Sequence, residues 1–337
     1  ITAVPVIDNG RIFVMDSRAR LTAVSTAGAP IWSVDLTPAS DDPDDGSGGG
    51  IAVAGNTVYA TNGFGQLTAL DTTTGDIRWQ HDFDAGAAAA PTVSDGVVYA
   101  VTTNATGWAL SADSGRVLWQ VVGTVADRSS TGAPSPVVAG PLVVFPFSSG
   151  QMVSAVSGTG GQAWAASVAG QRLGRAASVV TDLTGGPVFA DGQIFAGSYA
   201  GRAAAFDATT GDLVWQVGEG ASGPLWVAGG SIFFISDRNQ LIRLDSATGE
   251  TVWAQDLPLF TRERIRRRKA LFVHHGPLLA GGRFIVASDD GLLRQFDPVG
   301  GNLAGSIQLP SGAASSPVVA GRTLYVVTSN GELVALR

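Results

Sequence analysis

One short pattern recurs along the whole sequence. Its clearest copies are GQLTALDTTTGDIRW at 65–79, GRAAAFDATTGDLVW at 201–215 and NQLIRLDSATGETVW at 239–253. Five weaker copies bring the count to eight, and the last of them, 331–337, is cut short by the C-terminus. Such units bury their hydrophobic surface between neighbouring copies, because one unit alone cannot form a core. The repeat therefore restricts the chain to a repeat architecture.

Each unit predicts four short strands. Apolar and polar residues alternate with a period of two, and Gly-containing turns separate the runs, as in PTVSDGVVYA at 91–100. Four strands in about 45 residues are typical of one propeller blade. We expect an all-β fold, a single eight-bladed β-propeller domain over residues 1–337, with four-stranded antiparallel blades and an incomplete last blade. The repeated turn glycines are Gly28, Gly75, Gly115, Gly160, Gly211, Gly249 and Gly301.

A tryptophan closes most of the units. This large ring at a fixed offset predicts packing between neighbouring blades, and it occurs at Trp32, Trp79, Trp119, Trp164, Trp215 and Trp253. The seventh unit has Gly305 instead, so other side chains should fill that place. Trp108 and Trp226 lie outside the pattern. We expect them to fill gaps between blades, with a stacking floor for a quinone as the alternative.

The unit LxALDxxTGxxxW at 67–79 resembles the PQQ-like repeat. Quinoprotein dehydrogenases and the BamB family of outer-membrane assembly lipoproteins share this repeat, and the length of the chain is similar to that of BamB proteins. The stretch 181–216, followed by 227–245, resembles blades five and six of that family. In such propellers the N-terminal segment supplies the outer strand of the last blade. The resemblance thus implies that residues upstream of Ile1 are absent or that blade eight is incomplete.

The resemblance to the BamB family also implies a function. It indicates a non-enzymatic scaffold of the outer-membrane β-barrel assembly (BAM) complex, which binds the POTRA region of BamA and aids folding and insertion of outer-membrane proteins. Unfolded outer-membrane proteins are further partners to consider, and no cofactor is implied. The location would be the periplasmic face of the outer membrane of a Gram-negative bacterium. Attachment there would use an N-terminal lipid anchor that this sequence lacks.

Two inter-blade segments carry the partner-binding residues that the resemblance implies. The family has a Leu-x-Leu-Arg pattern in the segment that corresponds to 123–136. Here Arg128 lies within about one position of the arginine, the leucines are absent, and Val125 is the apolar candidate. In 168–184, Leu173 is an apolar candidate and Asp182 matches the first acid of an Asp-x-Asp pair. Thr184 replaces the second acid. A guanidinium on one loop and a carboxylate on the next would orient a protein partner.

Two other functions remain open, a periplasmic quinoprotein dehydrogenase with PQQ and Ca²⁺, and a propeller adaptor with an unrelated partner. Such dehydrogenases usually carry an adjacent cysteine pair, whereas this chain has no cysteine. The sequence also lacks GxSxG, HExxH and P-loop motifs. A net charge of −7 argues against nucleic acid as a partner. The sequence therefore favours a non-enzymatic protein.

Several polar groups resemble metal sites but have simpler interpretations. Repeated aspartates should cap their own turns by accepting backbone N–H groups, since they occupy equivalent positions, namely Asp71, Asp207, Asp245 and Asp297. The acidic stretch 41–50 lacks the spacing of a calcium loop and is expected to be a solvated connection. His274 and His275 are adjacent, so a strand would point them in opposite directions, and His81 is isolated. We predict no zinc site.

A cluster of basic residues lies between the sixth and seventh units. Six of the 21 basic residues lie within 262–269, in the segment TRERIRRRKALFVHH at 261–275. One hypothesis is a basic patch that attracts anionic lipid head groups or an acidic protein, formed by Arg264, Arg266, Arg267 and Arg268. The alternative is a long solvated loop.

Overall fold

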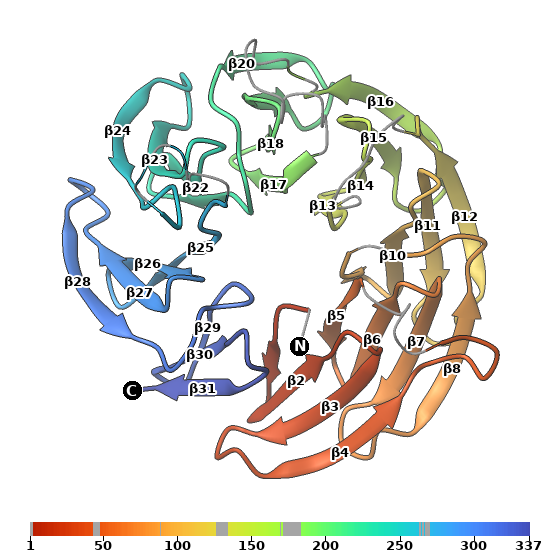
Figure 1. The fold of residues 1–337 in the computed structure, drawn as a ribbon. Helices are drawn as coiled ribbons and strands as arrows, with labels where there is room; N and C mark the ends of the chain where they lie inside the picture. Colours follow the sequence, from red (N-terminus) through yellow and green to blue (C-terminus); the bar gives the residue numbers. More distant parts are fainter. Residues whose placement is uncertain are drawn as a thin grey trace.

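The structure of this protein is a computed structural model that describes residues 3–42, 48–87, 89–125, 134–168, 170, 183–262, 264, 266 and 270–337. Eight antiparallel sheets stand around a central axis, and the last sheet lies beside the first (Figure 1). The predicted propeller with eight blades is confirmed. No helix in the described part of the chain has the length and apolar character needed to cross a bilayer.

Blades one to four each contain four strands in sequence order from the axis outward. Blade one comprises β1 (Val6–Asp8), β2 (Arg11–Met15), β3 (Arg20–Ser25) and β4 (Pro30–Asp35). Blade two comprises β5 (Gly49–Ala54), β6 (Thr57–Asn62), β7 (Gln66–Asp71) and β8 (Ile77–Asp82). Blade three comprises β9 (Thr92–Ser94), β10 (Val97–Val101), β11 (Thr106–Ser111) and β12 (Val117–Val122). Blade four comprises β13 (Val137–Ala139), β14 (Leu142–Pro146), β15 (Gln151–Val156) and β16 (Gln162–Ser167).

Blades five to seven repeat this order, and blade eight stops earlier. Blade five comprises β17 (Leu183–Ala190), β18 (Gln193–Ser198), β19 (Arg202–Asp207) and β20 (Leu213–Val217). Blade six comprises β21 (Trp226–Ala228), β22 (Ser231–Ile235), β23 (Gln240–Asp245) and β24 (Thr251–Asp256). Blade seven comprises β25 (His274–Ala280), β26 (Arg283–Ser288), β27 (Leu292–Phe296) and β28 (Leu303–Gln308). Blade eight has three strands within the described residues, as the sequence predicted, namely β29 (Val318–Ala320), β30 (Thr323–Val327) and β31 (Leu333–Leu336).

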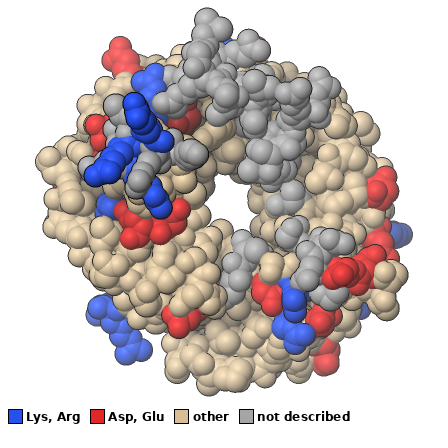
Figure 2. Space-filling model, in the orientation of Figure 1, with Lys and Arg blue, Asp and Glu red and all other residues tan. Residues whose placement is uncertain are grey.

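The two middle strands of a blade form its core. In blade two, all six residues of β6 are buried, whereas exposed and half-buried residues alternate along the outer strand β8. The middle strands are buried on both faces because both faces pack against neighbouring blades. A cavity of about 550 Å³ is lined by residues of several blades around the axis, and Figure 2 shows that the ring is open there.

The recurring tryptophans of blades one to five each join their blade to the next one. Trp215 of blade five donates its indole N–H to the Ser246 carbonyl of blade six, at 2.8 Å. The ring lies against the turn glycine of that blade, since a Cβ on Gly249 would come within 2.6 Å of Trp215 Cε3. Gly249 also has a φ of +75°, which favours glycine. The same indole bond joins Trp32 to Thr72, Trp79 to Ala112, Trp119 to Ser157 and Trp164 to Ala208.

The tryptophan contact between neighbouring blades is less complete in blades six and seven. Trp253 covers Gly301 of blade seven, but its buried indole nitrogen has no hydrogen-bond partner among the described residues. The expectation that other side chains fill the place of the missing tryptophan at Gly305 is wrong. A Cβ added there would meet no atom within 4 Å. Within the described residues, no glycine turn of blade eight follows β31 at the place that this tryptophan would cover.

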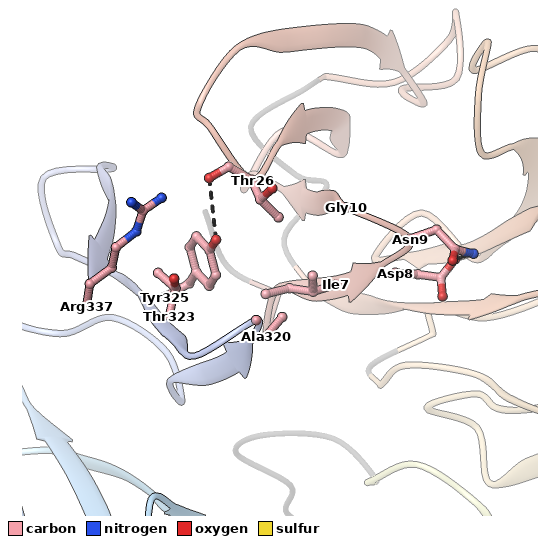
Figure 3. Close-up of a pocket in the computed structure, with 10 residues that line it drawn as sticks. Ile7, Asp8, Asn9, Gly10, Thr26, Ala320, Thr323, Tyr325 and Arg337 are labelled. Carbon is pink, nitrogen blue, oxygen red and sulfur yellow. Dashed lines mark hydrogen bonds between the residues drawn. The ribbon is translucent and has the colours of Figure 1, made fainter.

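At the interface between blades eight and one, a tyrosine hydroxyl takes the place of the tryptophan indole that joins other blades (Figure 3). The Tyr325 hydroxyl of β30 donates to the Thr26 carbonyl at 3.4 Å. Thr26 is the counterpart of the carbonyls that accept tryptophan indoles in other blades. Gly28, the turn glycine of blade one, has no neighbour that a Cβ would meet within 4 Å. A pocket of about 390 Å³ remains between the two blades, with Thr26, Tyr325 and Arg337 in its lining.

Candidate partner-binding face

All connections between consecutive blades emerge on the same face of the ring. Each runs from the outer strand of one four-stranded antiparallel sheet to the inner strand of the next sheet, so strand direction places every one at the same end. This face therefore carries the described ends of the two segments that the sequence singled out for partner binding, and the described residues of the basic segment after β24. The repeated aspartates lie at the turns of the opposite face.

The segment 123–136 is fixed at its start. Gly123 lies against the Phe147 ring, where a Cβ would come within 2.2 Å of Cδ2. Thr124 donates its backbone N–H to Gln151 Oε1 of blade four at 2.8 Å. The next side chain, Val125, is 57% exposed, so the structure places this predicted residue where a partner can reach it. Arg128 lies outside the described residues.

The segment 168–184 is fixed at both ends. Val168 is fully buried and donates its N–H to the Gly150 carbonyl at 2.9 Å. At the other end, the Thr184 hydroxyl donates to the Ala221 carbonyl of the next blade connection. Thr184, which replaces the second acid of the family pattern, is thus engaged inside the fold. The predicted partner residues of this segment, Leu173 and Asp182, lie outside the described residues.

The repeated aspartates cap their own turns, as predicted. Asp71 Oδ1 accepts the N–H groups of Thr73 at 2.7 Å and Thr74 at 3.1 Å. Arg78 and then these two N–H groups lower the pKa of Asp71 to about 2. Equivalent caps occur at Asp207, Asp245 and Asp297. Within the described ranges, no three His, Cys, Asp or Glu side chains are grouped as a metal site would require.

The off-pattern tryptophans pack between blades, which confirms the simpler interpretation. Trp108 is buried, and its ring centroid lies 5.0 Å from that of Phe83 and 5.7 Å from that of His81. Trp226 packs against the core shared by blades six and seven.

The sequence predicted that the whole acidic stretch 41–50 connects blades one and two. Its last two residues instead belong to β5, which begins at Gly49. Asp41 and Asp42 are exposed, and residues 43–47 lie outside the described part.

His274 belongs to a buried polar network at the base of the basic segment. Its Nε2 lies 2.8 Å from the Pro258 carbonyl, which only accepts, so Nε2 carries the proton. Its Nδ1 lies 2.6 Å from Ser288 Oγ, and Arg294 Nη1 donates to the same hydroxyl oxygen. Arg294 also pairs with Asp290. No local sequence pattern marks this network, because its members lie in three separate segments of the chain.

Acidification is expected to destabilise the fold through its buried histidines. Burial lowers the pKa of His274 below its usual value near 6.5, and it lowers those of His81 and His275 in the same way. Below about pH 6.5 the unfolded chain binds protons that the folded chain excludes. Stability is therefore full above this pH and falls as the pH drops through the lowered folded pKa. Each histidine contributes at most about 1.4 kcal/mol per pH unit.

Urea unfolding midpoints between about pH 7.5 and about pH 5.5 measure this effect. The variant His274→Gln should show a smaller difference between the two pH values than the original protein, whatever its overall stability. An equal difference in both proteins would mean that His274 does not contribute.

The basic segment is held by a short two-stranded stem. Thr261 donates its N–H to the Ala270 carbonyl at 3.1 Å, and Phe272 donates to Leu259 at 3.0 Å. The Asn239 side-chain amide donates to the Pro258 carbonyl at 3.2 Å and to the Phe272 carbonyl at 2.9 Å, which holds both strands at the base of the stem. Arg264 and Arg266 are exposed, whereas Arg267 and Arg268 lie outside the described residues. Lys and Arg side chains gather over blades six and seven in Figure 2.

Comparison with known proteins gives consistent matches. A family model described as outer membrane protein assembly factor BamB matches residues 17–255 and 262–337. The outer membrane protein assembly factor BamB of Moranella endobia (strain PCIT) is 24% identical over 343 residues, which span 98% of this chain and 84% of the relative.

Solved structures share the fold. The crystal structure of BamB from Moraxella catarrhalis matches with a TM-score of 0.78 at 20% identity, covering 99% of this chain and 93% of that one. A quinohemoprotein alcohol dehydrogenase from Pseudomonas putida matches with a TM-score of 0.71 at 16% identity, covering 96% of this chain and 69% of that one. At these identities the structural matches show the propeller fold alone.

Proposed function

The chain belongs to the BamB family of outer membrane protein assembly factors, and from this membership we propose that it is a non-enzymatic scaffold of the BAM complex. In this role it binds the POTRA region of BamA through the face that carries the blade connections. The family match over most of the chain is the observation that carries the proposal. The site of action is the periplasmic face of the outer membrane, where a lipid anchor holds the protein.

The fixed roots of the two candidate segments support this choice of face. Gln151 and Phe147 position the chain on the way to Val125, and Thr184 and Val168 secure the second segment. Anchored roots reduce the conformational entropy that loops lose on binding. Val125 and Leu173 would supply apolar contacts, while Arg128 and Asp182 would supply oriented charges at the rim of the interface.

The axial cavity supports a scaffold rather than a quinone enzyme. The quinoprotein alternative is favoured by the dehydrogenase structure with the same fold. However, the described residues that line the cavity are small or apolar and carry no charge, including Ala89, Ser135, Thr184, Ser222 and Ser316. Calcium and an anionic quinone call for charged ligands.

Charge reversal at Arg128 tests the proposed interface. If this guanidinium is a hot spot, Arg128→Glu should weaken binding to the POTRA region of BamA from the same organism by more than about 1 kcal/mol, or roughly fivefold. Isothermal titration calorimetry measures the change. Arg116→Glu is the matched control, because Arg116 is exposed and lies at a turn of the opposite face. This control should bind with unchanged affinity.

Two results would contradict the proposal. Equal weakening by both substitutions would point to a general charge effect and would remove Arg128 from the interface. An absence of binding by the folded protein, together with a rise in Tm on addition of PQQ and Ca²⁺, would favour the quinoprotein alternative, because a tight ligand stabilises the native state.

The outer edge of β31 is a candidate site for unfolded outer-membrane proteins. No described strand pairs with this edge, and an unpaired edge accepts an extended segment by β-augmentation. The alternative occupant is the N-terminal closing strand that the family resemblance implies.

A further inference from the structure

We propose that the basic hairpin, defined here by its described residues 259–262, 264, 266 and 270–273, binds the surface of an anionic lipid bilayer. Its contact residues are Arg262, Arg264, Arg266, Leu271 and Val273. This contact is separate from the proposed binding of BamA, since it uses a different blade connection. Its failure would leave the scaffold proposal untouched.

The charge of the hairpin is opposite to that of the chain. The protein carries a net charge of −7, yet six basic residues and one acid occupy positions 262–269. Like charges this close in sequence repel one another, and a partner of opposite charge would relieve this repulsion. Guanidinium groups are suited to phosphate, which they bind through two parallel hydrogen bonds.

Three described carboxylates on the face of the blade connections are engaged within the fold. Asp289 Oδ1 accepts the N–H of Val273 at 3.0 Å, and Asp290 pairs with Arg294 at 2.5 Å. Glu219 lies 3.9 Å from Arg238. Arg262, Arg264 and Arg266 form no ion pair with any residue that the structure describes, and all three are exposed. Their charges are therefore open to an external anion.

The stem presents these charges from a fixed base. Hydrogen bonds of Thr261 to Ala270 and of Phe272 to Leu259 close the stem, and the Asn239 amide holds both strands at its base. His274 adds a second bond to the Pro258 carbonyl. A partner surface can therefore meet the hairpin without ordering its base, which lowers the entropy cost of binding.

Two aliphatic side chains beside the charges favour a bilayer over an acidic protein surface. Leu271 is 47% exposed and Val273 is 51% exposed, and both follow the basic run in sequence. Segments that lie on membranes combine cations, which attract anionic lipids, with apolar side chains that enter the boundary between head groups and acyl chains. The hairpin offers both kinds of side chain.

Vesicle sedimentation tests the proposal. The complete protein should bind phosphatidylcholine vesicles that contain phosphatidylglycerol and should not bind vesicles of phosphatidylcholine alone. The triple variant Arg262→Gln, Arg264→Gln, Arg266→Gln should bind roughly 100-fold more weakly, since each cation near an anionic surface contributes about fivefold. Added salt should weaken binding by the original protein more than binding by the variant.

A matched triple variant controls for net charge. Arg116→Gln, Arg283→Gln and Arg322→Gln remove three exposed cations at the turns of the opposite face, and this variant should bind like the original protein. The pair Leu271→Ser and Val273→Ser should weaken binding and leave its salt dependence unchanged. Absence of binding to the anionic vesicles, or equal loss in both triple variants, would overturn the proposal and leave an acidic protein as the partner to test.

Discussion

Replacing Trp215 by alanine is expected to lower the free energy of unfolding by about 3–5 kcal/mol. The ring is 8% exposed and covers Gly249 of the next blade. Its removal opens a cavity between blades five and six, and it leaves the Ser246 carbonyl without the indole N–H that it accepts at 2.8 Å. The urea midpoint, measured with the slope of the transition, gives the change.

Trp253→Ala is the matched comparison. This ring also covers the turn glycine of the following blade, Gly301, but its buried indole nitrogen has no described hydrogen-bond partner. Removing the ring deletes an unsatisfied polar group together with the apolar contact. The free energy of unfolding should therefore fall by less than it does for Trp215→Ala, by a difference of about 1–3 kcal/mol. Equal losses in the two variants would show that the indole hydrogen bond adds nothing to the lock between blades.

Replacing Asp290 by asparagine is expected to cost about 3–5 kcal/mol, because it leaves the buried charge of Arg294 without its partner. The two side chains are only 10% and 11% exposed, and two guanidinium nitrogens reach the carboxylate at 2.5 and 3.2 Å. Burial alone would raise the pKa of Asp290, but hydrogen bonds from Arg294 and Leu292 and the charge of Arg294 lower it overall. Chemical denaturation at neutral pH measures the loss.

Asp35→Asn provides the control for the ion pair. Asp35 pairs with Arg20 at 3.1 Å, but these side chains are 50% and 53% exposed. Solvent screens such a pair, so the expected loss is below about 1 kcal/mol. Adding Arg294→Met to Asp290→Asn should recover much of the stability, because no buried charge then remains unpaired. A failure to recover would mean that Arg294 stabilises blade seven through its packing.

The repeat pattern was sufficient to predict the propeller, the number of blades and the short last blade. It was sufficient because alternation and turn glycines act locally, within each unit of about 45 residues. The caps at Asp71 and its equivalents were predictable for the same reason. The contact of Trp215 with Gly249 was not, because it joins two units and depends on how adjacent sheets twist and stack. The expectation at Gly305 failed on this point.

Fewer features of the candidate site could be predicted from the sequence. Val125 is exposed as a partner residue should be, whereas Arg128, Leu173 and Asp182 stay predictions. Side-chain networks such as that of His274 join residues from three separate segments, and no local pattern marks them. The signal that could have indicated the anchored hairpin was the pair of aliphatic residues, Leu271 and Val273, directly after a run of cations.

The direction of the tryptophan locks sets an order of assembly on the ribosome. Each of the five indole bonds reaches a carbonyl 31 to 44 residues further along the chain, so a blade is sealed only when synthesis of the following one is well advanced. Assembly can therefore proceed from the N-terminus without waiting for the whole chain. The contact between Tyr325 and Thr26 spans 299 residues. We therefore expect closure of the circle to come last, because it joins residues from the two ends of the described chain.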